Sequence, residues 1–151
     1  MWQKGKAYSR EHVIDVVKRI EKCLSTDNFA ITTTEKYYFQ RRAIRLKYNI
    51  YYEELKSILK SLKVENFCYS LVGNTAFDGE EDVPYTFLLC QNLYNADEDE
   101  HQYVHIIVSV VLIELADGKD FMAVDFYQTR KYNQISRGYY GGRHDRRESN
   151  M

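Results

Sequence analysis

Two apolar segments in the last third of the chain dominate its hydrophobic pattern. The first spans residues 104–115 and the second spans residues 121–127. β-Branched residues are frequent in the first segment, which favours a strand over a helix. The residues between them include Asp-Gly, the strongest short-range signal for a β-hairpin. Because the first segment is apolar on both faces, we expect it to be the central strand of a sheet that is covered on both faces.

The N-terminal third shows helical periodicity instead. Ser9 is a good N-cap, and apolar residues then recur at helical spacing up to Leu24. A polar, loop-forming cluster at residues 25–28 ends this helix, and residues 29–33 are expected to form a short edge strand.

Two further helices are expected over residues 35–48 and 52–62. Asn49 lies between them and suits the left-handed conformation that often ends a helix. The short link makes the two helices an αα-hairpin that can lie on one face of the sheet. The expected buried positions are Phe39, Ala43 and Leu46 in the first helix, and Leu55, Ile58, Leu59 and Leu62 in the second.

The remaining pattern completes an α+β fold. Strands are expected over residues 67–72 and 85–93, an exposed acidic loop over 73–84, and a hairpin tip over 95–100. A length of 151 residues fits a single domain.

Composition narrows the class of protein. The net charge of −1 creates no global attraction to nucleic acid. The chain has an odd number of cysteines, Cys23, Cys68 and Cys90, and they form no CxxC pair, which favours a reducing compartment. Cys68 and Cys90 fall in predicted strands, where buried structural thiols are usual. Without a signal peptide or a membrane-spanning apolar stretch, the sequence predicts a cytoplasmic protein with no membrane contact.

Charge is unevenly distributed along the chain. Residues 1–60 carry a net charge of +6, residues 78–100 hold eight acidic and no basic residues, and residues 128–151 carry +4. Two interpretations are open for the acidic residues 97–100 together with His101 and His105: a metal site or a solvated hairpin tip. The spacing of these residues matches no known metal-binding motif, so we expect no metal and no cofactor.

Two basic segments are candidates for contact with RNA. Arg41, Arg42, Arg45 and Lys47 form either a solvated helix flank or a set of phosphate contacts. Residues 127–132 and 137–140 alternate cations with aromatic rings, a composition that suits single-stranded RNA and equally an acidic protein.

Three segments carry a resemblance to a known family: Asn28-Phe29-Ala30-Ile31, residues 50–67, and Ala123-Val124-Asp125-Phe126-Tyr127. With the order of elements, they resemble the RelE-like toxin fold and, more closely, the MqsR family of type II toxin–antitoxin toxins. The resemblance spans about residues 10–130. It implies a single RelE-like domain over residues 1–141, in which an N-terminal helix and the αα-hairpin pack on a small antiparallel sheet. The polar composition of residues 142–151 separately predicts a disordered tail.

The resemblance implies a metal-independent endoribonuclease that cuts messenger RNA and is held inactive by a cognate antitoxin. This chemistry needs an acid and a base, and a cation for the charge on phosphorus. We expect Tyr127 to be the acid/base group, Arg130 to bind the phosphate and Gln91 to orient the 2′-hydroxyl. The expected RNA-binding residues are Lys131, Arg41, Arg42, Arg45, Tyr132 and Arg137.

Two positions depart from the family pattern. Tyr127 stands where the family has Lys or His, and Tyr69 stands where the family has Lys. The departures leave open a second hypothesis: a catalytically inactive binding protein on the same scaffold, which docks a protein partner through its acidic loop.

Overall fold

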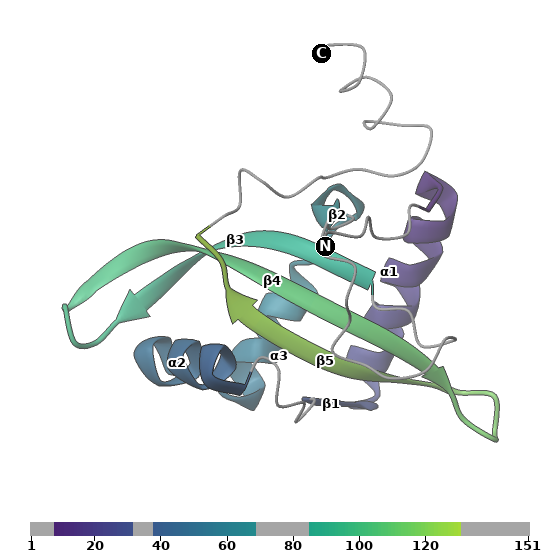
Figure 1. Ribbon diagram of the computed structural model, residues 1–151. Coiled ribbons are helices and arrows are strands. Elements are labelled where there is room, and N and C mark those ends of the chain that lie inside the picture. The colour runs from purple at the N-terminus through teal and green to yellow at the C-terminus, as the bar shows by residue number, and fades with distance from the viewer. Residues whose placement is uncertain (1–7, 32–37, 69–84, 131–151) are drawn as a thin grey trace, which may run out of the picture.

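The computed structural model describes residues 8–31, 38–68 and 85–130, and Figure 1 shows an α+β arrangement of helices on a five-stranded sheet. The helices are α1 (Arg10–Ser25), α2 (Tyr38–Tyr48), α3 (Tyr52–Lys60) and the short 3₁₀ helix η2 (Val64–Asn66). The strands are β1 (Phe29–Ile31), β2 (Phe67–Cys68), β3 (Tyr85–Asn95), β4 (Glu100–Glu114) and β5 (Asp120–Gln128).

The strand order is β1-β5-β4-β3-β2, so β4 is the central strand, as predicted. β2, β3, β4 and β5 pair antiparallel, but β1 pairs parallel with β5. The sheet is therefore mixed and not antiparallel throughout. β1 reaches the sheet from α1 and not through a hairpin with β5, which leaves it free to run parallel at the edge.

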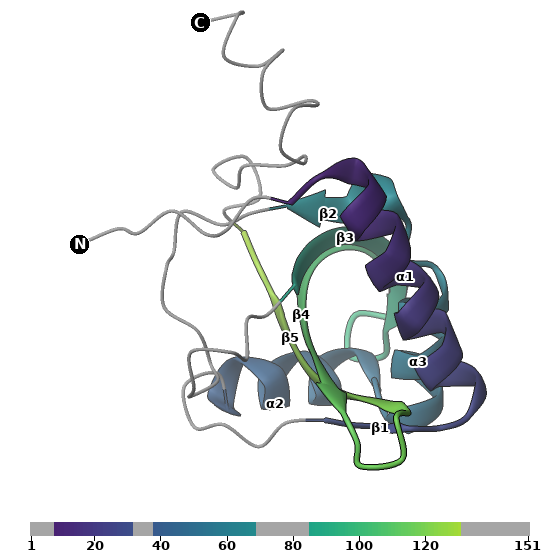
Figure 2. The same cartoon turned by 90° about the vertical axis from the view of Figure 1, so that its right-hand side faces the viewer.

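The described helices supply the core on one face of the sheet. In Figure 2, β3 and β4 curve around α1 and α3. Alternate residues of the strands point into this curve, because successive strand residues face opposite sides. The innermost are Val104, Ile106, Val108 and Val110 of β4 and Met122, Val124 and Phe126 of β5, all at most 2% exposed.

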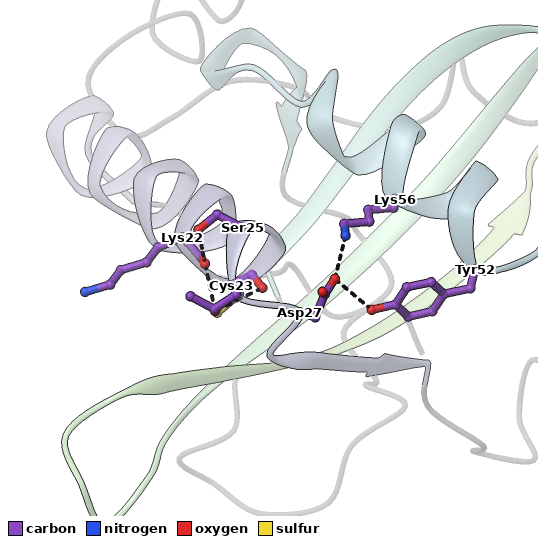
Figure 3. Close-up of polar contacts among 7 residues, drawn as sticks. Lys22, Cys23, Ser25, Asp27, Tyr52 and Lys56 are labelled. Atoms are coloured by element: carbon purple, nitrogen blue, oxygen red, sulfur yellow. Dashed lines mark hydrogen bonds and ion pairs between the residues drawn. The ribbon is translucent and has the colours of Figure 1, made fainter.

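α1 begins and ends as its sequence predicts. The Ser9 side chain accepts a hydrogen bond from the backbone N–H of His12, and the predicted apolar stripe is buried. After the helix, Asp27 adopts a positive φ of 56°, and its carboxylate accepts hydrogen bonds from Lys56 and Tyr52 of α3 (Figure 3). The Tyr52 ring also stacks on Phe29 at 4.9 Å, so α3 is fixed to the turn between α1 and β1.

The predicted buried side of α2 is wrong. Ile44 and Tyr48 are buried, while Ala43 is exposed and Leu46 is 60% exposed. Ile44 follows Ala43 by one residue, about 100° around the helix, so the stripe that packs is rotated from the predicted one. The side chain of Phe39 lies outside the described part.

The buried positions predicted for α3 and the segment after it, and the conformation predicted for Asn49, are confirmed. Leu55, Ile58, Leu59 and Leu62 are buried, and Asn49 has a φ of 53°. The β4–β5 turn places Gly118 at a φ of 83°, a conformation that favours glycine.

Several predictions fall outside the described residues. These are the strand beyond Cys68, the loop over residues 73–84 and the tail over 142–151. Within the described ranges, every helix is too short or too polar to cross a membrane.

Candidate active site

The sheet face opposite the helices, here called the outer face, is the place where strand alternation gathers candidate functional residues. None of the described helices packs on it. It carries a small apolar cluster of Cys68, Leu88 and Ile107, against which Tyr127 packs. Register places the following residues on it: Cys90, Asn92 and Tyr94 of β3; His101, Tyr103, His105 and Ser109 of β4; and Asp125 and Tyr127 of β5.

Tyr127 lies on the outer face near the end of β5. It is paired across the ladder with Ile107 of β4 and is partly exposed. The ring therefore rests on the apolar cluster while part of the side chain reaches the surface. A group held in this way has a fixed position, with part of it at the surface.

His105 is a diagonal neighbour of Tyr127. It precedes Ile107 by two residues and so shares the outer face, and its partner across β5 is Thr129, whose backbone N–H donates to the His105 carbonyl at 2.9 Å. Diagonal neighbours in a sheet lie about 7–8 Å apart. The two side chains therefore stand at neighbouring positions on the same face.

Sequence reasoning considered His105 only as a metal ligand and missed this pairing with Tyr127. Strand alternation could have shown this pairing, because the register of two antiparallel strands decides which residues share a face. The hairpin signal predicts that the two strands pair, but it does not give their register or the residue opposite Tyr127.

Asp125 is a second outer-face residue that sequence reasoning missed. It is only 1% exposed, lies opposite Ser109, and its carboxylate accepts a hydrogen bond from the backbone N–H of Phe126 at 2.8 Å. A carboxylate in the middle of an otherwise apolar strand is uncommon, because burying a charge needs compensating hydrogen bonds. Asp125 therefore places a carboxyl group two residues from Tyr127, on the same face.

Gln91 does not meet Tyr127. It pairs with Val104, a core residue, and its amide donates to the Ser61 hydroxyl beside α3 at 3.1 Å. Gln91 therefore lies on the helix-covered face, and Tyr127 lies on the other. The expectation that Gln91 orients the 2′-hydroxyl at the same site is not compatible with this arrangement.

The predicted cations are only partly described. Arg130, just after β5, is exposed, and so is Arg42 on α2. Arg45 is engaged within the fold, because its Nε donates to the Ile50 carbonyl at 3.3 Å and its guanidinium lies 5.6 Å from the Tyr51 ring centre. The side chain of Arg41, and all of Lys131, Tyr132, Arg137 and Tyr69, lie outside the described part.

One cysteine differs from expectation. Cys23 and Cys68 are buried, but Cys90 is exposed on the outer face, directly across from His105. In the described part of the chain, no helix covers β3 at this point. Cys90 is therefore the one cysteine of the three whose side chain is exposed.

The β3–β4 hairpin tip carries four adjacent carboxylates, at residues 97–100. The Gln102 amide donates to Glu98 and Glu100, and the Tyr94 hydroxyl donates to Asp99. Among the described residues, none of these carboxylates forms an ion pair. Within the same residues, no group of three or more His, Cys, Asp or Glu side chains is placed to hold a metal ion.

A separate aromatic cluster joins the start of α1 to β3. Tyr8 stacks on His12 at 4.6 Å, and the Tyr85 hydroxyl lies 3.0 Å from His12 Nε2. Burial, with a smaller contribution from Tyr85, raises the pKa of Tyr8 to about 12, and burial also raises the pKa of Tyr85. Both phenols stay protonated at neutral pH, so this cluster supports the fold and does not suit base catalysis.

The comparisons with known proteins identify no relative. No family model matches the sequence, and neither a curated protein nor a solved structure shows significant similarity to it.

Proposed function

We propose that this protein is a metal-independent endoribonuclease of the RelE-like toxin class, acting on messenger RNA from the outer face of its sheet. The observation that carries the proposal is the placement of Tyr127 and His105 as diagonal neighbours on a face that the described helices leave uncovered, with Arg130 exposed at the end of the same strand. Helices on one face and reactive side chains on the other are consistent with the RelE-like resemblance.

The proposed reaction is attack of a ribose 2′-oxygen on the adjacent phosphorus. The bond between this oxygen and phosphorus forms, and the bond from phosphorus to the 5′-oxygen breaks, which leaves a cyclic phosphate and a free 5′-hydroxyl. His105 takes the proton of the 2′-hydroxyl, because neutral imidazole is the common general base near pH 7. Tyr127 gives its phenolic proton to the departing 5′-oxygen, and Arg130 offsets the charge that develops on phosphorus.

This assignment modifies the roles expected from the sequence. Tyr127 serves as the acid, since its phenolic O–H can donate a proton. His105 replaces Gln91, which lies on the other face. We further propose that a cognate antitoxin protein holds the enzyme inactive, as the family resemblance implies.

The test is cleavage of RNA by the purified protein, both on free transcripts and on transcripts being translated in a cell-free reaction. We expect cuts that leave 5′-hydroxyl ends and persist in excess chelator. Once a cut is mapped, an oligonucleotide with a single 2′-deoxy nucleotide on its 5′ side should resist, because the attacking oxygen is missing. Cleavage of that oligonucleotide, or no cleavage in either setting, would refute the proposal.

A second candidate is a non-enzymatic binding protein on the same scaffold. The observation that favours it is the cluster of carboxylates at residues 97–100, beside Tyr103, which is 77% exposed. An acidic surface with an exposed ring suits a basic protein partner. Intact RNA together with a stable protein complex would favour this candidate over the nuclease.

A further inference from the structure

Among the described residues, the outer edge of β3 is open over most of its length. β3 pairs with β4 from Tyr85 to Asn95, but on its other side β2 pairs only with Phe87 and Thr86. In the part of the chain that the structure describes, no strand pairs with the rest of this edge. An unpaired edge presents backbone donors and acceptors to which another strand can bind.

The register shows which backbone groups point outward. In an antiparallel pair, backbone groups of alternate residues point toward the partner and away from it. The carbonyls of Thr86 and Leu88 accept from Cys68 and Asn66, which lie on the β2 side, so even-numbered residues point away from β4. The pairing continues without a break to Asn95. The outward-facing residues of the open edge are therefore Cys90, Asn92 and Tyr94.

The surroundings of this edge favour a cationic occupant. The edge ends at the four carboxylates of residues 97–100, which form no ion pair among the described residues. Tyr94 at the end of the edge is 43% exposed, and Tyr103 on the neighbouring strand is 77% exposed. Exposed rings beside carboxylates that have no cationic partner among the described residues attract Lys and Arg side chains through cation–π contact and charge.

We propose that the open edge of β3 binds an extended segment of a partner protein as an added strand, with basic residues of that segment against the hairpin tip. Backbone hydrogen bonds give such a complex its affinity, and alternate side chains of the added strand give it specificity. The added strand would lie next to Cys90 and so widen the outer face. Cys90 itself pairs with His105 of β4. This inference holds whether or not the protein cleaves RNA.

The first arm of the test leaves the protein unchanged and varies a probe peptide. The probe is a synthetic peptide of seven alternating valine and threonine residues followed by two lysines. One control peptide has glutamates in place of the two lysines. The other control carries N-methyl groups on every second amide and is made in two versions, one methylated at the odd-numbered amides and one at the even-numbered amides. We expect the lysine peptide to bind and to protect the amides of Cys90, Asn92 and Tyr94 from hydrogen exchange. The glutamate peptide and one of the two N-methylated peptides should bind at least tenfold more weakly.

The second arm changes the edge of the protein. Asn92→Pro removes one outward N–H and leaves the pairing with β4, because proline is tolerated at sheet edges. We expect it to weaken peptide binding at least tenfold while Asn92→Ser binds normally. The double variant Asp97→Asn, Glu98→Gln should bind the peptide about three- to tenfold more weakly, and this difference should disappear in high salt.

Three outcomes would overturn the proposal. One is no binding of the lysine peptide at millimolar concentration. Another is binding that protects amides elsewhere on the sheet. The third is a homodimer that Asn92→Pro dissociates, because the edge would then bind a second copy of this chain. The cleavage assay is independent of all three, so failure of this proposal is distinguishable from failure of the proposed nuclease activity.

Discussion

At the scale of single residues, Tyr127 and Gln91 form a matched pair for testing the site. Tyr127→Phe removes the phenolic proton and retains the ring that packs on the outer-face apolar cluster. We expect the rate of RNA cleavage to fall by about 100-fold or more, the usual contribution of a general acid. Thermal unfolding of the variant, measured alongside, separates a catalytic loss from a loss of structure.

Gln91→Ala is the control for that prediction. Gln91 lies on the same sheet but on its helix-covered face, so its removal should leave the cleavage rate within about twofold of the original and cost about 1 kcal/mol of stability through its lost hydrogen bond. If Gln91→Ala abolished cleavage and Tyr127→Phe did not, the site would have to be moved to the other face.

His105 offers a chemical test of its role as a base. His105→Ala should lower cleavage strongly, and free imidazole added to that variant should restore part of the rate, because it supplies the missing base. Added imidazole would not restore the cleavage rate if the missing histidine had only a structural role. Cleavage by His105→Ala at the full rate would remove this residue from the proposed mechanism.

At the scale of an element, α2 shows how packing selects one stripe of a helix. Ile44 is 1% exposed and belongs to the main core, whereas Leu46, two residues later, is 60% exposed. Ile44→Ala should lower the free energy of unfolding by about 2–4 kcal/mol, because it leaves a cavity. Leu46→Ala should change it by less than about 0.5 kcal/mol. Chemical denaturation of both variants measures the difference; equal effects would contradict the packing of α2.

β4 was predicted more reliably than α2, and the reason lies in the strength of the local signal. An apolar, β-branched segment next to an Asp-Gly turn satisfies propensity and turn chemistry at once. α2 has apolar residues on more than one side, since Ala43, Ile44, Leu46 and Tyr48 are interspersed with cations. Its sequence allows more than one buried stripe, and only the sheet against which it packs selects between them.

At the scale of the whole molecule, two carboxylates connect segments that are far apart in the sequence. Asp120 of β5 accepts two hydrogen bonds from Arg19 of α1, at 2.7 and 2.8 Å, and Asp27 is held by Lys56 and Tyr52 of α3. The hydrogen bonds from Arg19 lower the pKa of Asp120, and those from Lys56 and then Tyr52 lower the pKa of Asp27.

These shifts predict a loss of stability in acid. A carboxyl group with a lowered pKa in the folded state stabilises the fold fully above its unfolded pKa, near 4, and loses that contribution as the pH falls through the folded value. We expect Asp120→Asn to unfold at a lower temperature than the original at pH 7, with a cost of at most about 1 kcal/mol because the pair is partly exposed. The two proteins should converge below about pH 3, as followed by thermal melts across pH. A difference that grew in acid would contradict this assignment.

The sequence by itself determined the three α-helices, the β4–β5 hairpin and the centre of the sheet. Capping at Ser9, the left-handed position of Asn49 and the hairpin before Phe121 are local properties, so neighbouring residues suffice to predict them. The tertiary structure decided the parallel pairing of β1, the buried stripe of α2, and the strand register that puts His105 rather than Gln91 beside Tyr127. Each of these depends on contacts between residues distant in the sequence, and a shift of one residue in register would move every side chain of a strand to the opposite face.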